Sequence, residues 1–77
     1  MYTVIGIENV DYTNKMGKRI QGTKYHCHYE NSNRIVGFGT DSFYVPLSAH
    51  NDAIILGTMV EPLYNRYGNV SELRIVG

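Results

Sequence analysis

Segments that are typical of strands recur along this chain, with turn-forming residues between them. The turn candidates are 12–18 (YTNKMGK), 31–33 (NSN) and 67–69 (YGN), and the segments between them are rich in β-branched and aromatic residues. Short segments of this kind at spacings of about ten residues are typical of a small antiparallel barrel or sandwich. The sequence therefore predicts an all-β protein.

The clearest strand pattern lies at 19–30 (RIQGTKYHCHYE). Tyr25 and Cys27 fall on one face of this segment, and Lys24 and His26 fall on the other. Strict alternation of this kind indicates a half-buried strand with one face in the core.

The other predicted strands are marked by glycine and proline. Gly6 predicts a bend or bulge in the first strand. Pro46 ends the third because it has no N–H for the ladder, and Pro62 favours an edge or bulge position in the fourth. The five predicted strands are 2–11, 19–30, 34–45, 56–68 and 70–76.

One segment, 47–57 (LSAHNDAIILG), is the only plausible helix. Ser48 is a candidate for its N-cap, although Ile54 and Ile55 do not favour a helix. We therefore expect a single domain over 1–77: a five-stranded antiparallel Greek-key barrel of the OB-fold type, with one short helix between strands three and four. An SH3-like barrel is the alternative.

The small size of the chain predicts a partner subunit. A core built from 77 residues contributes only about 3–5 kcal/mol of net stability. Disulfides cannot supplement it because Cys27 is the only cysteine. Homodimer formation is the remaining way to add buried surface.

The residues that support catalysis or metal binding are sparse. Cys27 is flanked by His26 and His28, but neighbours in a strand point to opposite faces, so neither histidine activates the thiol. A structural zinc site needs four ligands, and His50 is the only further histidine. We expect no enzyme, no metal, no cofactor and no small-molecule substrate.

The N-terminal segment MYTVIGIENVDY does not resemble a signal peptide, because it lacks a basic region and its apolar run is interrupted by polar residues. No segment approaches the roughly 18 apolar residues of a membrane span. These observations predict a cytoplasmic protein that does not enter a membrane.

Basic residues interleave with aromatic ones along the chain, although the net charge is zero. Single-stranded nucleic acid is bound by this pairing, because cations follow the phosphates while rings stack on bases. Three alternatives remain open: core tyrosines beside solvated cations, a protein-interaction module such as an inhibitor of a host protein, and RNA binding. The DNA-binding residues that this pattern predicts are Lys15, Lys18, Arg19, Lys24, Tyr25, Arg34, Tyr64, Arg66 and Tyr67.

Two stretches carry a resemblance to a known family. They are DYTNKMGKRIQGTKYHCHYE at 11–30 and LGTMVEPLYNRYGNVSELRIV at 56–76. In them the chain resembles the small single-stranded-DNA-binding proteins of filamentous phages, the gene V protein type, and similar proteins of phages and mobile elements of Gram-positive bacteria. The resemblance implies an OB-fold homodimer that coats single-stranded DNA during phage or plasmid replication in the host cytoplasm.

The resemblance also implies roles for residues of the first hairpin, which is a DNA-binding wing in that family. Lys18 and Arg19 would contact phosphate, and Tyr25 would stack on bases. Stacking requires a bulge near Gly22, because alternation otherwise places Tyr25 beside Cys27. Outside the wing, the aromatic candidates are Phe43, Tyr44, Tyr64 and Tyr67. The neutral net charge departs from the family and predicts modest, salt-sensitive binding.

Overall fold

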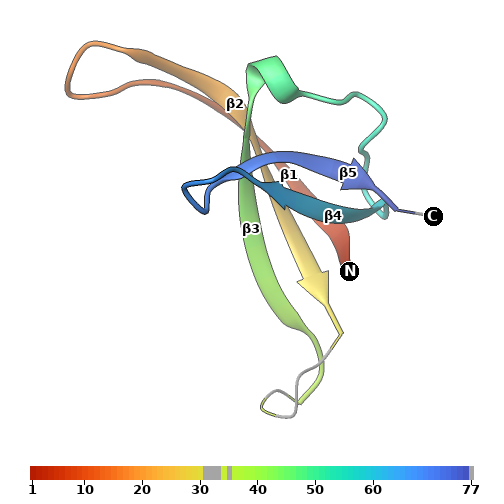
Figure 1. Ribbon diagram of the computed structural model, residues 1–77. Helices are drawn as coiled ribbons and strands as arrows, with labels where there is room; N and C mark the ends of the chain where they lie inside the picture. Colours follow the sequence, from red (N-terminus) through yellow and green to blue (C-terminus); the bar gives the residue numbers. More distant parts are fainter. Residues whose placement is uncertain (31–33, 35, 77) are drawn as a thin grey trace.

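The computed structural model describes residues 1–30, 34 and 36–76. Its elements are five strands and one short 3-10 helix, arranged as Figure 1 shows: β1 (Tyr2–Thr13), β2 (Arg19–Tyr29), β3 (Gly39–Pro46), η1 (Leu47–Ala49), β4 (Met59–Tyr64) and β5 (Val70–Ile75). The all-β prediction is confirmed.

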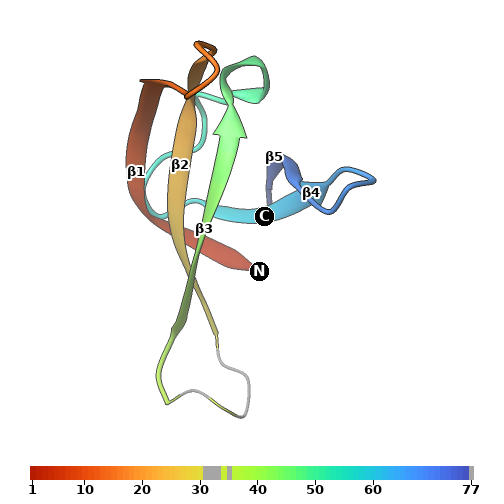
Figure 2. The ribbon, with the colours of Figure 1, turned by 90° about the vertical axis from the view of Figure 1, so that its left-hand side faces the viewer.

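All five strands belong to one antiparallel sheet with the order β3-β2-β1-β4-β5. β1, β2 and β3 run side by side, and the β4–β5 hairpin lies across one face of them (Figure 2). Among the residues that the structure describes, β3 and β5 form no ladder, so the sheet is not closed by hydrogen bonds. The five antiparallel strands are thus confirmed, whereas closure into a barrel is not.

The core lies between the three-stranded layer and the β4–β5 hairpin. Every strand contributes to it, and Ile54 of the long connection adds one more side chain. The buried apolar residues are Val4, Tyr25, Cys27, Phe43, Val45, Ile54, Val60 and Leu73. The predicted alternation of β2, with Tyr25 and Cys27 facing inward, is confirmed.

A bulge interrupts β1 where Gly6 predicted it. The β1–β2 register shifts between Val4 and Gly6 and then runs without a break from Gly6 to Thr13. Val10 pairs directly with Gly22 in that unbroken stretch, so the bulge expected near Gly22 is absent. Tyr25 therefore keeps its inward orientation.

Pro62 occupies the edge position that its missing N–H requires. It pairs with Leu73 of β5, whereas β1 pairs with β4 only at Met59 and Val60. A proline is tolerated where the strand has a neighbour on one side only.

The helix predicted over 47–57 is wrong beyond its first turn. After η1, the amide of Ala53 donates to Asn51 Oδ1, and the amide of Ile55 donates to Thr58 Oγ1. Gly57 then adopts a positive φ of 89°. Side chains that bond the nearby backbone compete with helix formation, and here they favour a series of turns.

The third strand begins later than predicted. Gly37 has a φ of 91°, which is incompatible with a continuous strand, and pairing with β2 starts at Gly39. Arg34 consequently lies in a turn and not in β3. The turn predicted at 31–33 lies outside the described residues.

Two hairpin turns share one construction. In the β1–β2 turn, Asn14 Oδ1 accepts bonds from the amides of Met16 and Lys18. In the β4–β5 turn, Asn65 Oδ1 accepts from the amides of two residues at the same offsets, 67 and 69. A glycine with positive φ, at 17 or 68, completes each turn. Both turns extend toward the left of Figure 1.

Candidate nucleic-acid interface

The outer face of β1, β2 and β3, which points away from the core, carries a shallow groove near the first hairpin. Cross-strand pairing brings Tyr12 beside Ile20, and Lys24 between Glu8 and Tyr44. The groove has a volume of about 440 Å³. We call it the outer-face groove; its lining residues are Glu8, Val10, Tyr12, Ile20, Lys24 and Tyr44.

Tyr44 is held in a fixed position in this groove. Its hydroxyl donates to the carbonyl of Gln21 over 2.9 Å. A Cβ on Gly22 would lie 2.7 Å from the Tyr44 Cζ, so the phenol end of the ring lies directly over this glycine. The ring remains 37% exposed. A ring fixed in this way is a preorganised surface on which a nucleobase can stack.

Lys24 supplies the cation of the groove. It is half-buried and has Tyr44 directly opposite on β3. A lysine stem covers apolar surface while its ammonium stays in water, so this geometry presents a positive charge beside the ring. Lys15 and Lys18 are exposed in the adjoining β1–β2 turn.

The groove also contains an acidic residue, whose negative charge offsets that of the cations. Glu8 lines the groove, and its Oε1 lies 3.0 Å from His26 Nε2. The contact becomes an ion pair only when His26 is protonated. With His26 neutral, the Glu8 charge reduces the positive potential around Lys24.

Arg19 does not line the groove. It lies on the opposite face of the hairpin from Lys24, where its Nε and Nη2 donate to the two carboxylate oxygens of Asp11 at 3.0 and 2.9 Å. These hydrogen bonds lower the pKa of Asp11 and raise the pKa of Arg19. The phosphate contact implied for Arg19 would have to use its remaining N–H groups.

The prediction that Tyr25 and Phe43 bind DNA is wrong. They are only 1% and 5% exposed, and both belong to the core. The Phe43 ring packs edge-on against Tyr2 at a centroid distance of 4.9 Å. Neither ring has a free face for a base, because each lies on the inward-facing side of its strand.

The remaining predicted residues lie elsewhere on the surface. Tyr64 ends β4, and Tyr67 is 73% exposed in the β4–β5 turn. The Arg66 guanidinium lies 4.9 Å from the Tyr67 ring centroid and donates to its hydroxyl. Arg34 is exposed before β3. None of these four residues lines the outer-face groove.

Sequence reasoning left Tyr12 out of the site, and its aromatic candidates included both Phe43 and its neighbour Tyr44 without a way to separate them. The missing information was the register of β3, which decides which of two adjacent rings faces outward. Gly22 could have indicated that a ring packs against β2 at this point, because a glycine inside a strand often marks close approach by another group. That ring is Tyr44.

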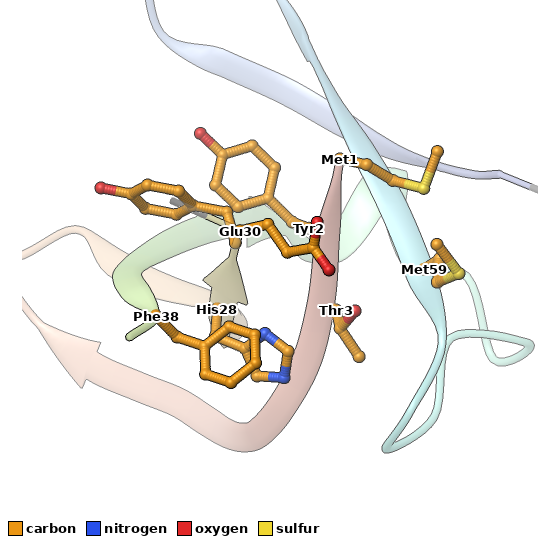
Figure 3. Close-up of a pocket in the computed structure, with 8 residues that line it drawn as sticks. Met1, Tyr2, Thr3, His28, Glu30, Phe38 and Met59 are labelled. Atoms are coloured by element: carbon orange, nitrogen blue, oxygen red, sulfur yellow. The ribbon is translucent and has the colours of Figure 1, made fainter. Parts of the chain in front are cut away.

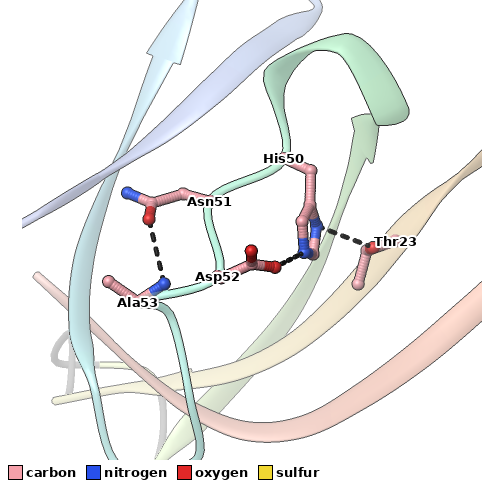
Figure 4. A network of polar contacts seen from close by, with 5 residues as sticks. All are labelled: Thr23, His50, Asn51, Asp52 and Ala53. Atoms are coloured by element: carbon pink, nitrogen blue, oxygen red, sulfur yellow. Dashed lines mark hydrogen bonds and ion pairs between the residues drawn. The ribbon is translucent and has the colours of Figure 1, made fainter.

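A second polar cluster joins the long connection to β2. His50 Nε2 lies 2.7 Å from Asp52 Oδ1, and His50 Nδ1 lies 3.4 Å from the hydroxyl of Thr23 (Figure 4). Thr23 is buried, whereas Asp52 is almost fully exposed. The contacts position the connection against the sheet next to the buried side chain of Ile54.

Cys27 is the core residue that the alternation predicted. It is fully buried, and burial together with the Asp41 charge raises the pKa of its thiol to about 11. A thiol with this pKa is protonated at neutral pH and is a poor nucleophile. Among the residues that the structure describes, no three acidic, histidine or cysteine side chains gather as a metal site.

Comparisons with protein-family models, curated proteins and solved structures found no match to this chain. Within the described residues, no helix has the length and apolar character needed to cross a membrane.

Proposed function

We propose that this protein binds single-stranded DNA with little sequence preference and without enzymatic activity. The observation that carries the proposal is the Tyr44 ring, which is fixed over Gly22 and has Lys24 as its cross-strand partner in the same groove. Stacking on a ring contributes about 1–3 kcal/mol per base and tolerates any base, while a neighbouring cation attracts the phosphates.

We also propose that the five strands form an OB-fold, which is a partly open Greek-key barrel with β3 and β5 at its edges. Strand order supports it, because β1 pairs with both β2 and β4. OB-folds bind oligonucleotides on the face of strands two and three and with the loops that follow strands one and four. Lys24 and Tyr44 lie on that face, and Lys15, Lys18, Arg66 and Tyr67 lie in those loops.

The biological role that we propose follows from the resemblance to small phage and plasmid proteins. The protein would cover single-stranded DNA during replication of such an element, in the cytoplasm of its host. Zero net charge makes the predicted affinity modest. It also makes binding dependent on local charge, and therefore sensitive to salt.

Fluorescence anisotropy with a labelled oligo-dT tests the proposal. We expect binding at about 50 mM salt and tens of micromolar protein, and progressive loss of binding as salt is raised. An unchanged anisotropy under the low-salt conditions would contradict the proposal. A parallel titration with oligo-U separates DNA from RNA preference, because a protein distinguishes them through the 2′-hydroxyl.

Homodimer formation remains a prediction, and the β1 edge is its candidate surface. In the described part of the chain, the β1 edge from Gly6 to Thr13 faces no second strand. Ile7 within this stretch and Ile5 just before it are exposed. Proteins usually cover or charge such edges. Sedimentation equilibrium should give twice the mass of the chain, and a monomer at all concentrations would refute the dimer.

A further inference from the structure

A second hollow lies where β1 begins and β2 ends, at the far end of these strands from the first hairpin. It has a volume of about 510 Å³ and is larger than the outer-face groove. We call it the end cleft (Figure 3); its principal lining residues are Tyr2, Thr3, His28, Tyr29, Glu30 and Phe38.

One wall of the end cleft is a pair of tyrosines in fixed positions. The Tyr29 ring occupies the space that a side chain at Gly39 would need. Tyr2 meets Tyr29 edge-on at a centroid distance of 5.5 Å and also packs against the buried Phe43. The wall is therefore built by core packing and by the absence of a side chain at position 39.

The other wall is an aromatic pair at the surface, formed by the half-buried His28 and the exposed Phe38. The rings of His28 and Phe38 lie 4.7 Å apart at an angle of 45°. Phe38 is 62% exposed. Two aromatic walls on either side of a hollow suit a flat ligand with apolar faces, and a nucleobase is such a ligand.

A carboxylate stands between the two walls. The Glu30 side chain extends into the end cleft between the Tyr2 ring and the His28–Phe38 pair (Figure 3). Among the described residues, no cation forms an ion pair with it. An ionised carboxylate only accepts hydrogen bonds, so the ligand it selects must present N–H donors at its edge.

We propose that the end cleft binds a guanine base of single-stranded DNA, with Glu30 accepting from its Watson–Crick edge. Guanine presents adjacent N1–H and N2–H donors there, which match the two oxygens of one carboxylate. Thymine presents one N–H between two carbonyls, and adenine and cytosine each place an acceptor beside their amino group. The end cleft therefore favours guanine at one position of the bound strand, whereas stacking in the outer-face groove accepts any base.

This inference rests on the proposed function, and the outer face of β2 connects the two sites. Lys24, His26 and His28 share that face. Lys24 lies in the outer-face groove and His28 in the end cleft, four residues or about 13 Å away along the strand. A DNA strand seated on Tyr44 and Lys24 can continue along β2 to the end cleft.

Competition between matched oligonucleotides tests the proposal. A short labelled oligo-dT is compared with the same oligonucleotide carrying one guanine or one hypoxanthine. We expect guanine to tighten binding by about 5- to 150-fold. Hypoxanthine lacks the N2–H donor and should lose most of that gain.

The variant Glu30→Gln should abolish the preference for guanine and retain binding to oligo-dT. The matched control Glu72→Gln changes an exposed carboxylate of β5, outside the end cleft, and should retain the preference. If the wild type binds oligonucleotides with and without guanine equally well, the guanine site is refuted but DNA binding is not. The same holds if Glu30→Gln keeps the preference for guanine. Failure to bind any of the oligonucleotides overturns the proposed function as well.

Discussion

Phe43 and Tyr44 are sequence neighbours with opposite environments. Phe43 points into the core, and Tyr44 lies on the outer face over Gly22. Because side chains alternate along a strand, a single residue of register decides which ring can meet a ligand. The same rule puts Tyr25 in the core and Lys24 in the outer-face groove.

Tyr25 should stabilise the fold and not contact DNA. Replacing a buried ring by alanine costs about 3–5 kcal/mol, which is comparable to the whole stability expected for a domain of this size. We expect Tyr25→Ala to be largely unfolded by circular dichroism at 25 °C. The control Tyr67→Ala, at an exposed turn position, should retain the wild-type urea midpoint. A folded Tyr25→Ala protein that no longer binds DNA would restore the stacking role.

Cys27 should make the protein less stable at alkaline pH. Burial raises the pKa of its thiol from 9.0 to about 11, so between these values the folded state holds a proton that the unfolded state releases. The free energy of unfolding is then highest below pH 9 and falls as pH rises toward 11. Burial also raises the pKa of the Tyr25 hydroxyl, which acts in the same direction.

Urea titrations at several pH values measure this effect, with Cys27→Ala as the comparison. The variant should be less stable at pH 7 because a buried side chain is truncated, but its stability should fall less steeply above pH 9. An identical pH dependence in both proteins would show that the thiol does not contribute.

Local sequence signals predicted five strands and two hairpin turns, but they did not predict the start of β3 or the structure of the long connection. The strands follow from alternation, and the turns follow from Asn14 and Gly17 and their equivalents at 65 and 68. In residues 50–58, helix formation competes with hydrogen bonds from side chains to the backbone. The bonds made by Asn51 and Thr58 favour turns over a helix here. Composition alone does not settle such a competition.

The outer-face groove depends on pairing between strands that are distant in sequence. Tyr12, Lys24 and Tyr44 come from three different strands, and only the registers of β1 and β3 against β2 bring them together. Sequence reasoning identified Lys24 from its own strand, but it had no means of fixing β3 relative to β2.

Gly22→Ala should disturb both the fold and the groove. The added Cβ would collide with the Val45 carbonyl and the Tyr44 ring. Overpacking of this kind costs about 1–3 kcal/mol. We expect a lower urea midpoint and weaker oligo-dT binding. At Gly6, an added Cβ would lie 3.3 Å from the His26 Cβ, so Gly6→Ala is a milder control. Wild-type stability of Gly22→Ala would show that the sheet tolerates the ring in another position.

The net charge of the whole molecule is a poor predictor of DNA binding, because acidic and basic side chains are distributed unevenly over its surface. Asp11 pairs with Arg19, and Glu61 pairs with Arg74. Glu8 instead lies in the outer-face groove with Lys24. Binding to a polyanion should therefore depend more on Glu8 than on the total of seven acidic residues.

Glu8→Gln should strengthen oligo-dT binding. Removing an exposed charge near the phosphates changes the binding free energy by about 0.2–1 kcal/mol, which is up to about fivefold in affinity. The gain should shrink as salt is added, because salt screens the charge. Glu72→Gln on β5 makes the same change outside the groove and should have little effect. Weaker binding by Glu8→Gln would place the DNA on a different face.

Oligo-dT titration of Tyr44→Leu against the wild type decides whether the Tyr44 ring binds single-stranded DNA. The substitution removes the stacking ring but leaves an apolar side chain over Gly22, and circular dichroism verifies that the variant is folded. The outer-face groove predicts the loss of one stacked base, which is about 1–3 kcal/mol or 5- to 150-fold in affinity. Unchanged affinity in a folded Tyr44→Leu protein would exclude the outer-face groove as the DNA-binding surface.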